Sequence, residues 1–215
     1  MKQNVLETMK NGRPDAFVNE WEPFPQVWDP VFYYLFNVAP GGEAINPWGV
    51  KIYWGKNEPG IMPIVNEKTK VCPDVTRWRE YVKAPDLYAL DLDWAQAKAD
   101  AEKIRAEGKF VHVWLPTGVF EQLHFLMGFE DTLLNFLEEP EAMHELIAYI
   151  KDWKLQQIRI LIDNLRPDVM NFHDDWGAKH AMFMNPDTWR EFFKEPYREI
   201  YGLMKKHGVI SMHHA

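Results

Sequence analysis

The amino-acid sequence predicts an α/β fold with parallel strands in one domain of 215 residues. Hydrophobic residues make up 47% of the chain and aromatic residues 14%, which is enough to bury a large core and excludes a disordered tail. From about residue 91 onward, segments with helical apolar spacing alternate with short β-branched and aromatic segments. Because the connections between them are short, we expect the strands to run parallel and to be joined by crossover helices.

The first 90 residues are expected to form ordered loops with short strands. Most of the 15 prolines of the chain fall here, together with Gly and Trp, and they interrupt helical and strand periodicity every few residues. Disorder is unfavourable in this region because tryptophans such as Trp48 and Trp78 would expose large apolar areas to water. One early segment, residues 15–20, is expected to form the first parallel strand.

The part from residue 91 onward contains three further expected strands, which are β-branched or aromatic and bounded by turn residues. They lie at residues 110–115, 168–172 and 209–212. Helical segments are expected to begin at Asp91 or Asp93, near residue 119, at Pro140 and at Asn185. Gly108 and Gly208 end the first and the last of them, and Pro196 is expected to kink the last. In the long helix from Pro140, only Lys154 breaks the apolar spacing.

This count gives about four parallel strands, whereas a complete (β/α)8 barrel has eight strands and roughly 250 residues. The chain also stops inside or just after a strand, and a buried parallel strand left as an open edge is unfavourable. We therefore expect a parallel α/β chain truncated after about four or five strands, with the C-terminal part missing and residues 1–215 forming a single domain.

Charge and cysteine content exclude several classes of function. The 24 Lys and Arg against 32 Asp and Glu give a formal charge of -8, so nucleic acid is not an expected partner. No apolar run approaches the roughly 20 residues needed to span a bilayer, and the N-terminus has no signal peptide, which predicts a cytoplasmic protein. The single cysteine, Cys72, excludes an internal disulfide and a multi-cysteine zinc site built from these residues alone.

Polar and aromatic side chains gather where the expected strands end. In parallel α/β folds these ends share one face, and the active site lies there. The candidate catalytic residues are Glu20, His173, Asp174 and Asp175. Two adjacent carboxylates beside an imidazole shift one another's pKa and suit proton donation or metal binding, although either aspartate would also serve as a turn cap.

The last strand ends in a histidine pair, His213 and His214. Adjacent strand residues point to opposite sides, so only one of the two can face the barrel axis, and His213 is the candidate metal ligand. The alternatives are ordinary histidines at a frayed end and, for Glu20, a solvated loop charge. The candidate substrate-binding residues at these ends are Trp21, Trp114 and Trp176.

The segment 168–213 resembles the uroporphyrinogen decarboxylase superfamily. Its members often have an Asp-Asp-x-Gly-like turn after a strand, a Met-x-x-Pro-x-x-Trp-x-x-Phe helix, and a strand that ends in histidine. The corresponding parts here are residues 174–177, residues 182–192 and His213. Residues 45–50 resemble an Asp-x-Trp-Gly turn with Asn46 in place of the acid, and this resemblance makes Asn46 a further candidate substrate-binding residue. The resemblance implies a TIM barrel, and it allows a homodimer.

Two chemistries occur in this superfamily. True uroporphyrinogen decarboxylases need no cofactor and bind a polyanionic tetrapyrrole through an arginine-rich loop, whereas this chain has Asn19-Glu20-Trp21-Glu22 after its first expected strand. Negative charge at that position disfavours decarboxylation in haem biosynthesis, which stays as the alternative. An inactive or binding-only fragment is the second alternative.

The resemblance is closer to the cobalamin-dependent methyltransferases, and in particular to O-demethylase-type members. It implies methyl transfer between a methylated aromatic substrate or a pterin carrier and the corrinoid of a partner protein, with Asp174 or Asp175 binding or protonating the carrier. An acidic mouth lined by Trp21, Trp114 and Trp176 suits a flat neutral or cationic substrate. Thiol-methylating members hold zinc through a His-x-Cys pair, but Ala215 stands in the cysteine position, which puts a zinc site in doubt.

Overall fold

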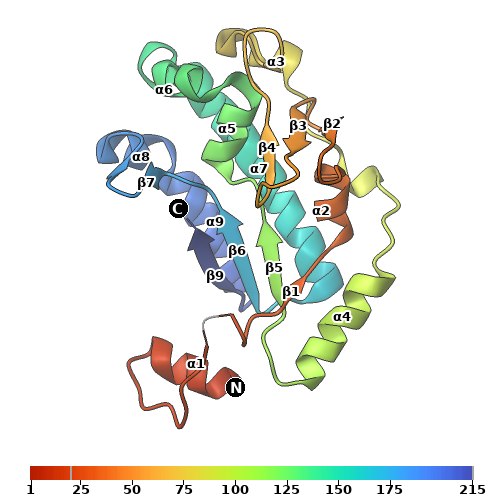
Figure 1. Cartoon of the computed structure of the whole chain (residues 1–215). Helices are drawn as coiled ribbons and strands as arrows, with labels where there is room; N and C mark the ends of the chain where they lie inside the picture. The colour runs from red at the N-terminus through yellow and green to blue at the C-terminus, as the bar shows by residue number, and fades with distance from the viewer. Residues whose placement is uncertain (20, 215) are drawn as a thin grey trace.

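The chain folds around a four-stranded parallel sheet, as seen in a computed structural model that describes residues 1–19 and 21–214. The strand order is β1-β5-β6-β9, so each strand pairs with the next strand of the sheet along the chain (Figure 1). These strands are β1 (Gln26–Val27), β5 (His112–Leu115), β6 (Val169–His173) and β9 (Ile210–His214). The expected parallel α/β fold is therefore confirmed.

Helices cover one face of this sheet. In Figure 1 the long helix α7 and helix α9 lie behind strands β5, β6 and β9, and α4 lies to the right of α7. The helices of this part are α4 (Ala95–Ala106), α5 (Val119–Met127), α6 (Phe129–Glu138), α7 (Pro140–Leu165), α8 (Pro186–Phe192) and α9 (Lys194–Lys206). The two glycines expected to end α4 and α9, Gly108 and Gly208, both adopt a positive φ.

Strand alternation divides the side chains of the sheet into two sets. Alternate residues, among them Leu115 and Phe172, are fully buried in the main core against the helices. The opposite set points to the other side of the sheet, which we call the front face. The front face consists of His112, Trp114, Val169, Asn171, His173, Ile210, Met212 and His214.

A small apolar cluster covers the amino end of the front face. Helix α1 (Lys2–Met9) contributes Val5, which packs with Phe110 and Val169. The ring of Phe24 stacks on that of Phe110 with 5.1 Å between the centroids. This cluster leaves the carboxyl end of the front face for polar groups.

The N-terminal region is richer in regular structure than its punctuation suggests. A three-stranded antiparallel sheet consists of β2 (Glu43–Ile45), β3 (Lys51–Trp54) and β4 (Ile61–Pro63). The other elements of this region are α2 (Pro30–Leu35), α3 (Trp78–Tyr81), and 3-10 turns at Val75–Arg77 and Leu87–Ala89.

Outside this region, β7 (Gly177–Ala178) and β8 (Ala181–Met182) form a short hairpin after β6. No helix in the described part of the chain is long and apolar enough to cross a membrane.

Two expected elements differ from the structure. Residues 15–19 form no strand, and β1 lies later in the chain, where Gln26 pairs with His112 and Val27 with Val113. The apolar residue Val18 of the expected strand packs instead against the small cluster at the amino end. The last helix is not one kinked helix, because α8 ends at Phe192 and α9 begins at Lys194.

Candidate functional site

Two histidines meet at the carboxyl end of the front face. The register of β6 and β9 pairs His173 with His214, and their rings stack with centroids 4.8 Å apart. Asp175 follows in the turn after β6, and its Oδ1 lies 3.5 Å from Nε2 of His214. One ligand atom from each of these three residues lies within 4.8 Å of the others. We call this group of His173, Asp175 and His214 the rim triad.

A buried carboxylate orients the first member of the rim triad. Oε1 of Glu121, on helix α5, lies 2.7 Å from Nδ1 of His173. Burial lowers the pKa of His173, but the hydrogen bond and charge of Glu121 together with the charges of Asp175 and Asp174 outweigh it, so the pKa is raised from its ordinary value. Because Nδ1 is held by Glu121, the atom of His173 that is left for a ligand is Nε2.

An aromatic wall borders the rim triad. The indole of Trp114 lies against the ring of His173, with 5.4 Å between the centroids and 35° between the planes. The two side chains come from neighbouring strands, and both are partly exposed. A flat ligand above the front face would therefore contact an indole on one side and polar groups on the other.

The rim triad has the donor set of a divalent-cation site. Two imidazole nitrogens and one carboxylate oxygen are ligands that zinc and other first-row divalent ions accept. Three protein ligands leave a further coordination position for water or substrate. A zinc site of the His-x-Cys type does not fit this sequence, because residue 215 is alanine and the one cysteine, Cys72, is buried in the main core.

Asp174 has a different environment from Asp175. It has 0% exposure and accepts hydrogen bonds from the backbone N–H groups of Phe120 and Glu121 at 3.2 and 2.7 Å. The indole of Trp176 and the hydroxyl of Tyr197 also donate to it. Burial raises the pKa of Asp174 to about 6, although these donors oppose the shift. With no exposed surface, Asp174 caps the start of α5 and is unavailable to a substrate.

His213 lies on the opposite side of β9 from the rim triad. Its ring packs against Trp176 with centroids 4.0 Å apart, and its Nδ1 is hydrogen-bonded to the hydroxyl of Tyr201. Burial lowers the pKa of His213 to about 4, so it is neutral at physiological pH. The structure thus places His214, and not the candidate His213, with the other potential metal ligands, because only one of two adjacent strand residues can point to the front face.

The remaining candidates are spread over the molecule. Trp21 precedes β1 and is 56% exposed, so it lies before the amino end of the strand, away from the rim triad. Oδ1 of Asn46 accepts hydrogen bonds from the backbone N–H groups of Trp48 and Val50, which makes it a turn residue. Trp176 packs among aromatic rings beside Asp174, and Glu20 lies outside the described residues.

The sequence did not identify Glu121 as a site residue. Of the histidine pair it favoured His213 as the metal ligand, whereas His214 is the one that points to the front face. No local signal marks Glu121, since it lies in the first turn of a buried helix and approaches His173 only in the folded chain. For His214 a signal existed, because His173 and His214 follow directly after two expected strands, 168–172 and 209–212. Once the register of these strands is known, the alternation of side chains places both histidines on the same face.

A scan against models of known protein families finds no match, and a search of curated proteins finds no relative. The resemblance to the uroporphyrinogen decarboxylase superfamily therefore stays a prediction.

Proposed function

We propose that this chain is an enzyme that transfers a methyl group between a methylated substrate or carrier and a corrinoid protein, with the rim triad as its reaction centre. The observation that carries the proposal is the convergence of His173, Asp175 and His214 at the carboxyl end of parallel strands. In barrel and open α/β enzymes, catalytic groups come from that end of the sheet.

We further propose that the sheet is part of the wall of a barrel of the uroporphyrinogen decarboxylase type. The consecutive strand order and the helices on one face support this, because a barrel wall is built in the same way. The motif residues that carry the resemblance also contact one another: Trp176 donates to Asp174 and packs on His213.

The residues of the rim triad would bind and orient the oxygen or nitrogen atom that carries the methyl group. Glu121 fixes the ring of His173, and the partly exposed Asp175 takes the role expected for either aspartate. The aromatic face of Trp114 would hold a flat substrate such as a neutral methoxylated aromatic compound or a pterin. A corrinoid on the partner protein would supply the cobalt chemistry that accepts or donates the methyl group.

A divalent cation held by the rim triad would supply Lewis acidity, which stabilises negative charge on the atom that the methyl group leaves. The chain's own contribution is to present two imidazoles and a carboxylate within a few ångströms and to fix the tautomer of one imidazole through Glu121. Water reaches this end of the front face, since the side chain of His214 is 59% exposed.

The experiment is a demethylation assay with the full-length protein, reduced free cobalamin and a panel of neutral methoxylated aromatics, such as methoxyphenols, and methyl-pterins. We expect loss of the reduced-cobalamin absorption with at least one substrate, and a loss of activity of at least about 100-fold in Asp175→Asn and His214→Ala. His207→Ala, an exposed histidine at the far end of α9, is the control and should keep full activity. Failure of every methyl donor, together with carbon dioxide release from uroporphyrinogen, would show that decarboxylation is the correct function.

A further inference from the structure

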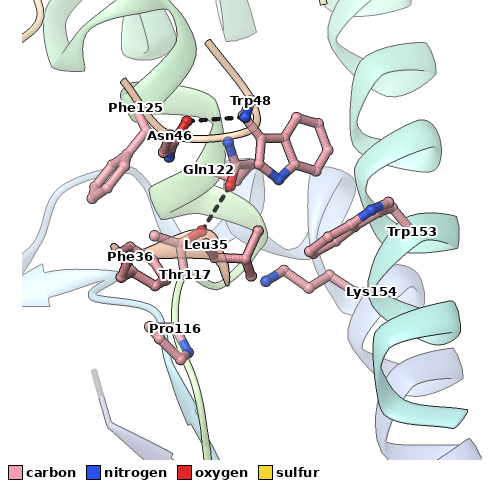
Figure 2. A pocket seen from close by; sticks show the side chains of 10 residues that line it. All are labelled: Leu35, Phe36, Asn46, Trp48, Pro116, Thr117, Gln122, Phe125, Trp153 and Lys154. Carbon is pink, nitrogen blue, oxygen red and sulfur yellow. Dashed lines mark hydrogen bonds between the residues drawn. The ribbon is translucent and has the colours of Figure 1, made fainter. Parts of the chain in front are cut away.

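A small donor-rich cavity lies just beyond the carboxyl end of β5, among α2, α5 and α7. It is lined by residues of α2, the 46–48 turn, the 116–117 segment, α5 and α7, and Figure 2 shows its side chains. The space open to the centre of a water-sized sphere is about 10 Å³, enough for about one water molecule or one small ion. The residues of interest are Lys154, Gln122 and Asn46, which we call the donor trio.

Lys154 brings a cation into this cavity without a carboxylate partner. Its side chain is 1% exposed, and its amino group donates one hydrogen bond, of 3.2 Å, to Oε1 of Gln157. Among the described residues no ion pair involves Lys154. The Trp153 ring, with its centroid 5.0 Å from Nζ, is the other favourable contact. In Figure 2 the amino group points into the cavity, toward Thr117.

The other two members of the trio also present donors, because their acceptors are already used. Oε1 of Gln122 accepts the hydroxyl of Thr117 at 2.8 Å, while its Nε2 is buried without a partner. Oδ1 of Asn46 accepts two backbone N–H groups, so its free atom is Nδ2. A buried amide nitrogen that makes no hydrogen bond is unfavourable, and it indicates that something in the cavity accepts from it.

We propose that the donor trio binds a small monovalent anion, a halide or one oxygen of a small carboxylate. An anion would accept from the buried Nε2 of Gln122 and lie against the amino group of Lys154, which satisfies both groups at once. The charged amino group would repel a cation, and a neutral water would leave that group without an ion pair, because Asp174 and Glu121 act on its charge only from beyond ion-pair distance.

The titration of Lys154 agrees with this assignment. Burial lowers the pKa of Lys154 to about 7, although Asp174 and Glu121 act in the opposite direction. An anion beside the amino group would favour the charged form and raise that pKa.

The anion site is separate from the rim triad. The donor trio lies among residues of the main core and not on the front face. Anion binding at the trio therefore does not depend on the proposed methyl transfer.

The test is anion titration of the full chain in gluconate buffer at constant ionic strength, with chloride and formate as probes. We expect a saturable rise in the unfolding temperature with one of the probes, together with broadening of the chloride-35 NMR line for chloride. In Lys154→Met the dependence should disappear, and in Gln122→Met it should weaken at least about tenfold in apparent affinity, the equivalent of one hydrogen bond to a charged group.

Lys151→Met is the matched control, because Lys151 lies on the same helix and is paired with Asp152 and Glu199 at the surface. It should keep the anion response of the unmodified protein. A flat titration in the unmodified protein would overturn the proposal, and so would an equal response in Lys154→Met. If Lys154→Met does not fold, the response of Gln122→Met decides.

Discussion

Asp174 and Asp175 are neighbours in the chain but have different surroundings. Asp174 is enclosed between β6 and the start of α5, where four donors surround its carboxylate. Asp175 stands beside His214, with a side chain that is 42% exposed. The sequence offered capping and catalysis as alternative roles for these residues, and the surroundings assign capping to Asp174 and leave Asp175 for chemistry.

Removal of the Asp174 carboxylate should destabilise the fold. In Asp174→Ala the backbone N–H groups of Phe120 and Glu121 lose their acceptor in a buried environment, at a cost of about 1–3 kcal/mol for each unsatisfied donor. We expect the free energy of unfolding, measured by urea denaturation, to fall by about 3 kcal/mol or more. Asp187→Ala, at an exposed position on α8, should change it by less than about 0.5 kcal/mol. Equal effects of the two changes would contradict the capping role.

The buried amino group of Lys154 should make stability depend on pH. Its pKa in the folded chain is about 7, against 10.5 for an ordinary lysine. Between these values the unfolded chain binds more protons than the folded chain, so the free energy of unfolding rises as pH increases from about 7 toward 10.5. In Lys154→Met this contribution to the rise should be absent. Identical pH profiles of both proteins in anion-free urea denaturation would count against the buried, low-pKa lysine.

The junction between β5 and α5 is the element on which the candidate site depends. Gly118 donates its N–H to the carbonyl of His173 at 2.6 Å and lies directly against Asp174. Helix α5 then carries Glu121 to His173. The approach of α5 to β6 therefore sets both the Asp174 cap and the orientation of one member of the rim triad.

A side chain at residue 118 should separate these elements. The Cβ of Gly118→Ala would lie 2.0 Å from Cβ of Asp174, so one of the two backbones has to shift. We expect the free energy of unfolding, measured by thermal or urea denaturation, to fall by about 1–3 kcal/mol. Gly202→Ala provides a matched control, because a Cβ there meets nothing within 4 Å and the change removes a glycine from helix α9. The free energy of unfolding of Gly202→Ala should rise by up to about 1 kcal/mol. A fall in it as large as that of Gly118→Ala would contradict the steric explanation.

The elements that the sequence predicted best are those with strong local signals. Apolar spacing, Asn185 and the two C-terminal glycines located the regular helices, and β-branched runs located β5, β6 and β9. The first strand was misplaced because β1 is only two residues long and depends on pairing with β5. Lys154 was visible as a polar break in the apolar spacing of α7, but its surroundings come from segments far away in the chain.

The two faces of the sheet have different roles in the molecule as a whole. The helix-covered face holds the main core, while the front face has an apolar cluster at its amino end and the rim triad at its carboxyl end. Contacts between neighbouring strands, which no local pattern reveals, bring together residues about 40 positions apart, such as His173 and His214. The candidate site is thus a product of register rather than of any single motif.

The most direct test of this account is zinc binding by the full chain, measured by isothermal titration calorimetry with circular dichroism to check the fold. The rim triad predicts one zinc ion for each chain, a loss of binding in His214→Ala and His173→Ala, and binding retained in His213→Gln. Retained binding in His214→Ala with loss in His213→Gln would contradict the geometry described above. Absence of zinc binding by the unmodified protein would leave the rim triad without the metal that the account assigns to it.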